Sequence, residues 1–187
     1  MISQIEFEEK CQEYDKIESR ANYFERASKL LNKNFKTEAR ILLLATWNFA
    51  GFRYGINEFN TEEFDYLFYS LNPTLLKLKE EKIEKADFKK LEEDISKIYT
   101  PLSKIKGIQY TGASKLMLLE NPSLFSPWDQ YIRKEYGFGT SANDYSSFLG
   151  EMQKRFSHLT APKNKTLAKA IDEFNYITIT IPALKKQ

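Results

Sequence analysis

An aspartate at the start of a short expected helix is the residue whose surroundings point most directly to chemistry. Asp129 follows Pro127 and Trp128 and precedes an expected helix over residues 130–136. A fixed carboxylate can stabilise positive charge that develops on a substrate, and it can orient an attacking water. Aspartate is also a good N-cap, because its side chain accepts hydrogen bonds from the first amides of a helix. The two roles can coexist in one residue.

A lysine 14 residues upstream of that aspartate, Lys115, is the other candidate for chemistry. A lysine whose pKa is lowered in a pocket can form a Schiff base with an electrophilic carbon. The simpler interpretations are a solvated side chain or a contact to phosphate. His158 is interpreted as a surface residue rather than a base. With Cys11 as the single cysteine and His158 as the single histidine, no soft-ligand cluster for zinc is expected, and no metal site is predicted.

A tight turn between two helical arms precedes these residues. The turn covers residues 105–109, with Gly107 at its centre and Lys104 and Lys106 beside it. Apolar periodicity predicts one arm over 91–102 and a second, with a small-residue face, over 111–119. Glycine in such a turn allows a positive φ or a close approach of the backbone to a phosphate. Asn121 and Pro122 end the second arm, and the chain then leads to the aspartate.

The sequence thus has a helical hairpin and, 18 residues after Thr111, an acid at the start of a helix. This pattern resembles the helix-hairpin-helix (HhH-GPD) DNA glycosylase superfamily, the relatives of endonuclease III. The resemblance implies a hairpin that grips a DNA phosphate and a carboxylate beside the sugar of a flipped nucleotide. Two positions depart from the family pattern. Gln109 stands where a second hairpin glycine is usual, and Thr111 stands where strand-cutting members carry a lysine. The second departure favours a monofunctional glycosylase, which hydrolyses the N-glycosidic bond of a damaged or mismatched base.

The resemblance also suggests roles for other residues. Asp129 is the expected catalytic carboxylate, and Lys115 is the alternative nucleophile. The expected DNA contacts are Lys104, Lys106, Gly107, Gln109, Thr111 and Arg133. The expected base pocket or wedge is formed by Trp47, Arg53, Tyr54 and Trp128, since aromatic rings stack on bases and arginine binds phosphate. The implied partner is double-stranded DNA. No cofactor and no obligate protein partner are expected, and one cysteine excludes the four-cysteine iron–sulfur cluster of many superfamily members.

The distribution of charge agrees with a hairpin that meets phosphate. Residues 1–100 hold 16 Lys+Arg and 19 Asp+Glu, a net charge of −3, whereas residues 101–187 hold 12 and 7, a net charge of +5. The basic excess therefore lies in the half that contains the hairpin. There is no apolar run of 18 or more residues and no charged-then-apolar leader, so no membrane span or signal peptide is expected. Together with the single cysteine, this predicts a cytoplasmic protein.

Helical periodicity predicts one all-α domain over residues 1–187, in which the hairpin segment covers residues 91–137. The helices of this domain can form two lobes with a cleft between them. Thr37 is expected to cap a buried helix over 41–50, in which Asn48 needs a buried hydrogen-bond partner. Residues 51–61 are expected to form a loop with aromatic anchors, and residues 177–181 an extended tail. Further helices are expected over 5–33, 61–71, 74–82, 143–156 and 167–174, with the charged run 78–94 as a solvated helical face.

Two other classes of function fit the same residues. The departures at Gln109 and Thr111 also suit a non-catalytic helix-hairpin-helix DNA-binding module, and a helical hairpin can equally mediate protein contacts. The salt dependence of binding to duplex DNA would distinguish the DNA-binding module from the protein-contact hairpin. Only contacts to phosphate release counterions, so only the DNA-binding module should bind less tightly as salt rises.

Overall fold

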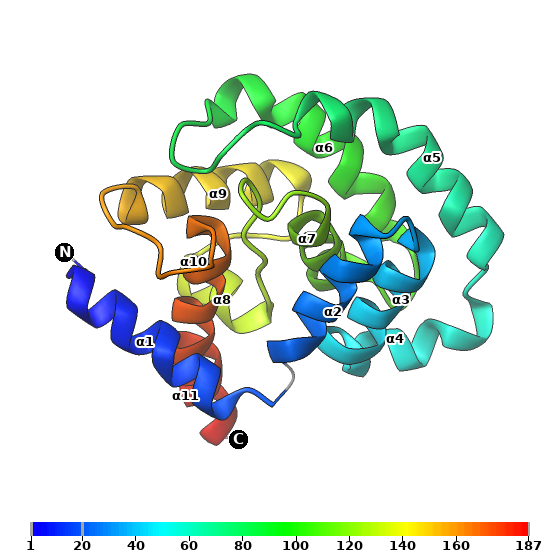
Figure 1. The fold of residues 1–187 in the computed structure, drawn as a ribbon. Coiled ribbons are helices and arrows are strands. Elements are labelled where there is room, and N and C mark those ends of the chain that lie inside the picture. The colour runs from blue at the N-terminus through cyan, green and yellow to red at the C-terminus, as the bar shows by residue number, and fades with distance from the viewer. Residues whose placement is uncertain (1, 20, 187) are drawn as a thin grey trace.

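The computed structural model describes residues 2–19 and 21–186, and within these ranges the chain is helical and contains no strand (Figure 1). This confirms the prediction of an all-α protein. The helices are α1 (Gln4–Ile17), α2 (Ala21–Asn32), α3 (Lys36–Trp47), α4 (Phe49–Gly55), η1 (Ile56–Glu58), α5 (Thr61–Lys77), α6 (Phe88–Lys104), α7 (Gln109–Glu120), α8 (Gln130–Glu135), α9 (Ala142–Phe156), α10 (Leu167–Asn175), η2 (Tyr176–Thr180) and α11 (Ile181–Lys185).

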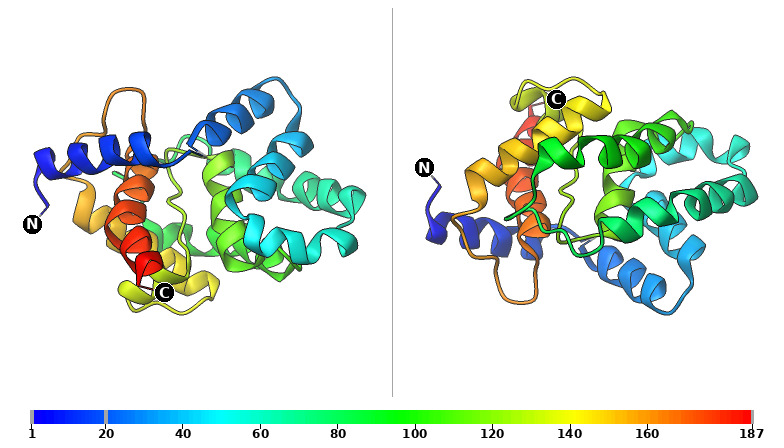
Figure 2. Two further views of the ribbon diagram at one scale, coloured as in Figure 1. Left: turned by 90° about the horizontal axis from the view of Figure 1, so that it is seen from below. Right: turned by 90° about the horizontal axis from the view of Figure 1, so that it is seen from above.

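Two groups of helices lie on either side of the extended segment 121–129 (Figure 2). In one group α1 packs against α10 and η2, and in the other α2 packs against α3, which packs against α7. Helix α6 joins them, because it packs against both α7 and α9. A single buried cluster runs through both groups, from Phe7 of α1 through Trp128 to Leu44 of α3. The segment that carries Asp129 is therefore held from both sides.

Local capping explains where several helices begin. Ser141 and Asp144 form a reciprocal capping box at the start of α9. Asn60 accepts hydrogen bonds from the amides of Glu62 and Glu63 and so opens α5. Asp129 caps α8, which confirms the capping role expected from its position.

The prediction of a loop over residues 51–61 is wrong. Residues 49–55 form α4 and residues 56–58 form a 3₁₀ turn. The glycines, which suggested a loop, instead let this helix approach the hairpin closely. A Cβ at Gly55 would lie 2.3 Å from the carbonyl oxygen of Lys106, and one at Gly51 would lie 3.1 Å from that of Gly107. The helix is thus part of the support of the hairpin.

Several expected helix boundaries between residues 36 and 82 are also wrong. Helix α3 begins at Lys36, so Thr37 lies inside its first turn, where its hydroxyl donates to the carboxylate of Asp65. It ends at Trp47 rather than at residue 50. Helix α5 continues through Pro73 to Lys77 instead of restarting at residue 74. Pro73 is exposed, so water can satisfy the carbonyl that loses its helical partner.

The charged run and the tail also differ from expectation. Residues 78–87 form turns, and the run becomes helical only at Phe88, where Asp87 caps α6. Residues 177–181, expected to be extended, are helical: residues 176–180 form a π-helical turn between α10 and α11, and α11 begins at Ile181. The β-branched alternation suggested a strand, but contacts with α1 and α8 hold this stretch as a continuation of the helix. Within the described ranges, none of the helices has the length and apolar character needed to cross a membrane.

Candidate active site

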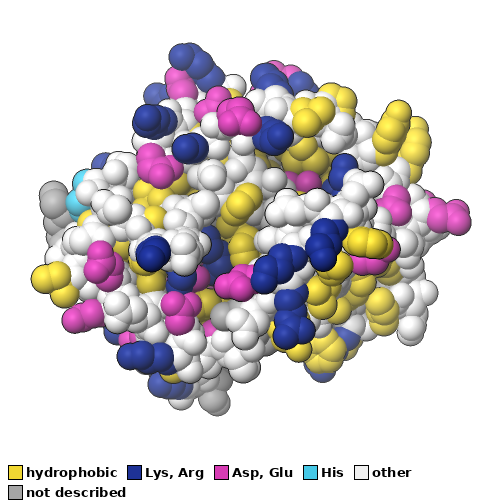
Figure 3. Space-filling model, viewed as in Figure 1, with side chains coloured by type: hydrophobic (Ala, Val, Ile, Leu, Met, Phe, Trp, Pro, Cys, Tyr) yellow, Lys and Arg dark blue, Asp and Glu magenta, His cyan; other side chains and the backbone are white. Residues whose placement is uncertain are grey.

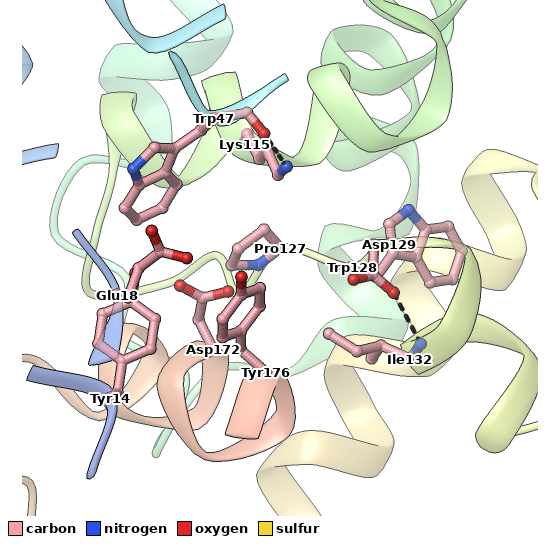
Figure 4. A pocket seen from close by; sticks show the side chains of 10 residues that line it. All are labelled: Tyr14, Glu18, Trp47, Lys115, Pro127, Trp128, Asp129, Ile132, Asp172 and Tyr176. Atoms are coloured by element: carbon pink, nitrogen blue, oxygen red, sulfur yellow. Dashed lines mark hydrogen bonds between the residues drawn. The ribbon is translucent and has the colours of Figure 1, made fainter. Parts of the chain in front are cut away.

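A small cavity lies between the two groups of helices, and both candidate catalytic residues line it (Figure 4). Its volume is about 50 Å³, the space of a few water molecules. Its walls come from α1, α3, α7, the segment before α8, α8, α10 and η2. The lining residues are Tyr14, Glu18, Trp47, Lys115, Pro127, Trp128, Asp129, Ile132, Asp172 and Tyr176. Residues from distant parts of the chain thus converge on one small space with polar and aromatic walls.

Asp129 is held by donors on both of its oxygens. Oδ1 accepts hydrogen bonds from the backbone amides of Tyr131, at 2.7 Å, and Ile132, at 2.9 Å. Oδ2 accepts one from the hydroxyl of Thr180 in η2, at 2.6 Å. Three donors fix the orientation of this carboxyl. The cap and the cavity-lining position therefore belong to the same residue, and the π-helical turn supplies its second support.

Lys115 comes to the cavity from α7. Its ammonium donates a hydrogen bond to the backbone carbonyl of Trp47 at the end of α3, as drawn in Figure 4. The indole of Trp47 stacks on Phe24 of α2, with 5.4 Å between ring centroids. Lys115 therefore ties α7 to the end of α3, at the wall where an aromatic ring faces the cavity.

A second carboxyl lines the cavity on the side of α10, and the sequence did not reveal it. Asp172 is 8% exposed, and its Oδ2 accepts a hydrogen bond from the ammonium of Lys169 at 3.1 Å. Lys169 is itself buried and also donates to Glu173 at 2.9 Å. Burial raises the pKa of Asp172, against the opposing effect of Lys169, and the neighbouring charge of Glu173 adds to the rise. Asp172 thus lies beside a buried lysine and a second carboxylate, whereas Asp129 is bonded by backbone amides and a hydroxyl.

A network of ion pairs, which reaches from buried Lys169 and Glu173 to exposed Asp15, supports that second carboxyl. Lys165 bonds both Glu173, at 2.5 Å, and Asp15 of α1, at 2.7 Å. Burial opposes the charge on Lys169, but Asp172 and Glu173 more than offset this, so the pKa of Lys169 is raised. The ammonium of Lys169 also lies over the rings of Tyr14, Trp47 and Phe24, at 4.6, 5.0 and 5.7 Å from their centroids. Helices α1, α2, α3 and α10 therefore meet around one buried cation.

An open groove leads from the cavity to the hairpin. Trp47, Lys115 and Asp129 line both the groove and the cavity, while Gln109 and Thr111 line the groove alone. Thr111, an expected DNA contact, lines the groove but does not line the cavity. The two predicted catalytic residues and two predicted DNA contacts thus share one continuous surface.

The hairpin has the backbone geometry that glycine would favour at two positions. Gly107 has φ +85° and Gln109 has φ +51°. Gln109, at the place of the usual second glycine, therefore adopts the left-handed conformation with a side chain attached. A Cβ on Gly107 would lie 3.1 Å from Cα of Gly55 and 3.2 Å from the carbonyl oxygen of Phe52, a tight contact to which the backbone of α4 would have to adjust.

Asn48 has the buried partner that the sequence required. Its side-chain amide donates to the carbonyl oxygens of Gly107, at 2.8 Å, and Ile108, at 3.3 Å. It also lies against Gly112 of α7, where a Cβ would be 2.7 Å from its Nδ2. Asn48 therefore fixes the hairpin to the junction of α3 and α4, and it lines the groove as well.

The other expected DNA contacts have varied surroundings. Lys104 is exposed at the end of α6, and Lys106 is exposed but forms an ion pair with Glu58. Arg133 is half-buried; it donates to the carbonyl of Phe138 at 2.6 Å and lies 5.3 Å from the ring centroid of Tyr110. Lys104 is thus the freest of the three to meet a phosphate, whereas Arg133 supports the turn after α8.

The four residues expected to form a base pocket or wedge fall into two places. Trp47 and Trp128 line the cavity, but Trp128 is 1% exposed and packs on Tyr145 and Phe148 at centroid distances of 5.1 and 5.2 Å. Trp128 is therefore a wall rather than a mobile stacking ring. Arg53 and Tyr54 lie on α4, bonded to each other at 2.8 Å, and line neither the cavity nor the groove.

Sequence reasoning missed the contributions of α1, α10 and η2. Tyr14 lies in the helical stretch expected over residues 5–33 and was assigned no role in a site, and Asp172 lacked any motif. A carboxylate between apolar neighbours, as in the stretch Ala170-Ile171-Asp172-Glu173-Phe174, was the available signal. Thr180 lay in the stretch interpreted as an extended tail.

Comparison of this chain with protein-family models, with curated proteins and with solved structures finds no match. In the described part of the chain, no group of three or more His, Cys, Asp or Glu side chains is arranged to hold a metal ion. Cys11 is buried against the carbonyl of Ala170, and burial raises the pKa of its thiol to about 12, so it is not a nucleophile.

Proposed function

We propose that this protein is a DNA glycosylase that removes a damaged or mismatched base from duplex DNA by hydrolysis. One observation carries the proposal. Asp129 and Lys115, selected from the hairpin pattern, line a single cavity, and the groove at its mouth reaches the first turn of α7 after the hairpin. A DNA strand held at the hairpin would present a neighbouring nucleotide to the cavity.

In the proposed reaction the bond between C1′ and the base breaks, and its electron pair leaves with the base. Positive charge develops on the sugar, and water adds to C1′ and loses a proton. Asp129, oriented by three donors, would stabilise the charged sugar. One such charge at about 4 Å, with an effective dielectric near 20, is worth roughly 4 kcal/mol, or about a thousandfold in rate.

Contacts to the DNA backbone would come from the groove and its surroundings. Tyr110 and Thr111 belong to the first turn of α7, whose amides have no partner within the helix and suit a phosphate. The amides of Ile108 and Gln109 already donate to the carbonyl of Ile105, at 3.1 and 3.2 Å. Lysine and arginine side chains also gather over α2, beside the hollow in the middle of the face in Figure 3. The exposed cations there are Arg26, Lys29, Lys33 and Lys36.

A base requires more room than the cavity offers. A volume of about 50 Å³ holds a few waters, so binding of a flipped nucleotide must move part of the wall. Trp47 forms the side of the cavity nearest the groove, since it lines both. We expect its indole to shift when DNA binds, and its fluorescence to report that shift.

Lys115 is assigned as a positioned cation rather than as the nucleophile. A Schiff base requires a side-chain nitrogen that is able to attack, whereas Nζ of Lys115 donates a hydrogen bond to the backbone carbonyl of Trp47. The product is then an intact abasic site. Reduction with borohydride during the reaction tests this, because a Schiff base would become a covalent adduct. An adduct absent from Lys115→Gln but present in Lys106→Gln, whose lysine lies outside the cavity, would overturn the hydrolytic assignment.

The function itself is tested with a panel of duplexes, each carrying one damaged or mismatched base, incubated with the protein and then treated with alkali. Strand breaks that appear only after alkali at one lesion are the expected result. Salt-dependent binding without breaks at any lesion would instead support the non-catalytic DNA-binding module. Absence of salt-dependent binding would support a hairpin that makes protein contacts only.

A further inference from the structure

The carboxyl of Asp172 stands on a wall of the cavity different from that of Asp129. Figure 4 shows Asp172 rising from α10 between Tyr14 and Tyr176, while Asp129 lies toward α8. Among the described residues, the hydrogen-bond donor to Asp172 is Lys169, which bonds Oδ2 from inside the protein. Oδ1 is then the oxygen available to a molecule in the cavity.

The surroundings of Asp172 are unlike those of a simple structural ion pair, because the residue is buried yet lines a cavity. The titratable groups that face it are Lys169 and Glu173 of α10, Tyr176 of η2, Tyr14 and Glu18 of α1, Lys115 of α7, Asp129, and Tyr145 of α9. Burial raises its pKa; Lys169 and Lys115 lower it, and Glu173 raises it. The net rise keeps a larger share of this carboxyl protonated than an exposed aspartate would keep.

Lys169 suits a carboxyl that changes its charge. The ammonium is held by Glu173, at 2.9 Å, and by the ring of Tyr14, whose centroid lies 4.6 Å away. It therefore stays in place whether Asp172 is neutral or ionised. When Asp172 is ionised, the ammonium at 3.1 Å from Oδ2 stabilises the new charge.

We propose that Asp172 is the general acid that protonates the departing base, while Asp129 stabilises the sugar. This rests on the glycosylase function proposed above. As the bond from C1′ to the base breaks, its electron pair moves onto the base, and a ring nitrogen or oxygen of the base takes the proton from Oδ1 of Asp172. The carboxylate left behind is stabilised by Lys169. Water then adds to C1′, its proton passes to solvent, and Asp172 regains a proton from solvent.

The positions of Asp172 and Asp129 support these two separate roles. If the sugar of a flipped nucleotide lies against Asp129, the space between the walls formed by α1 and α10 is left for its base. Asp172 is on that side, between two tyrosine rings that can flank a base. General acid catalysis contributes about 100-fold to 10,000-fold in rate when the group is well placed.

The test is the pH dependence of single-turnover excision, measured on the lesion duplex that the panel shows to be cleaved fastest. For the parent protein we expect the rate to fall as pH rises through the pKa of Asp172. In Asp172→Asn the rate should be lower by about 100-fold or more, and this fall with pH should be absent. Asparagine keeps the shape of the side chain and still offers an oxygen to Lys169, so a melting curve shows whether the variant is folded.

Glu173→Gln is the matched control, since Glu173 shares Lys169 with Asp172 but does not line the cavity. Glu173 raises the pKa of Asp172, so removing its charge should move the fall in rate to lower pH without abolishing it. This variant also tests the proposal if Asp172→Asn does not fold. If the fall in excision rate of Glu173→Gln occurs at the same pH as in the parent, Asp172 is not the general acid. The same conclusion follows if Asp172→Asn has the pH–rate profile of the parent. Neither result contradicts the glycosylase function itself. No excision by the parent at any lesion contradicts the proposed function, and the general acid with it.

Discussion

The hairpin and the cavity lie along one groove, yet they are held in shape by different interactions. The hairpin is held by its backbone: Gly107 has a positive φ, packs against α4, and accepts a hydrogen bond from Asn48. The cavity is held by ionised side chains, most of all the buried ammonium of Lys169 between Asp172 and Glu173. A single added methyl group should therefore disturb the structure of the hairpin, and the removal of a single charge should disturb the structure of the cavity.

The comparison also separates two kinds of function. Backbone groups and exposed lysines can position a phosphate without any change of charge. Breaking a glycosidic bond requires a fixed charge and a transferable proton, which only ionisable side chains supply. Substitutions at the cavity should therefore change the rate of excision, whereas substitutions at the hairpin should change affinity and stability.

The largest expected effect is on the rate of excision in Asp129→Asn. Removing the charge while keeping the shape should lower single-turnover excision by about a thousandfold. Asparagine caps helices about as well as aspartate, so the melting temperature should change little. Affinity for duplex DNA should hold or rise slightly, since a negative charge near phosphates is lost. An unchanged rate of excision would remove Asp129 from the mechanism and limit it to capping α8.

The next effect is on stability, in Lys169→Met. Loss of the ammonium leaves Asp172 without its donor and Glu173 with Lys165 alone, in a part of the protein that excludes water. Removing one partner of a buried ion pair costs about 3–5 kcal/mol. Urea denaturation measures this cost. Lys97→Met, which removes an exposed ammonium paired with Glu93 four residues earlier, should leave the transition nearly unchanged. Equal transitions for the two variants would mean that the buried network does not hold the cavity.

A smaller effect is expected in the hairpin, from Gly107→Ala. A residue with a side chain at φ +85° costs about 1–2 kcal/mol, and here the added Cβ would also press on the backbone of α4. Both stability and affinity for duplex DNA should therefore fall. Gly137→Ala is the matched control, because Gly137 has φ +75° but nothing within 4 Å of the added Cβ. If the two variants unfold at the same urea concentration, the contact with α4 does not support the hairpin.

The smallest effect is a gain in stability, from Gln109→Gly. The left-handed conformation at φ +51° suits glycine, and relief of that strain outweighs the greater freedom of glycine in the unfolded chain. We expect a gain of roughly 0.5 kcal/mol, seen as a higher urea midpoint. Asn164→Gly, at φ +68°, should gain less, because asparagine tolerates this conformation better than glutamine does. A loss of stability in Gln109→Gly would show that the glutamine side chain contributes contacts of its own.

Features that depend only on neighbouring residues in the chain could be predicted from the sequence. Apolar spacing predicted the arm before the hairpin, and α6 is found there. Asp129 was predicted to cap α8, because a cap depends on the next three residues. The same local reasoning failed at residues 51–61 and 177–181. Glycines and β-branched residues carry weak preferences, and contacts with the hairpin in one case, and with α1 and α8 in the other, outweighed them.

Only the tertiary structure decided what surrounds the catalytic candidates. Lys115 and Asp129 were known from the sequence, but their shared cavity depends on the packing of α7 against α3 and on segment 121–129 between the two groups of helices. Asp172 carries no motif, since its properties arise from burial and from the charges of Lys169, Lys115 and Glu173. Burial and charge at a site are sums over residues that are far apart in the chain, and no local pattern records such a sum.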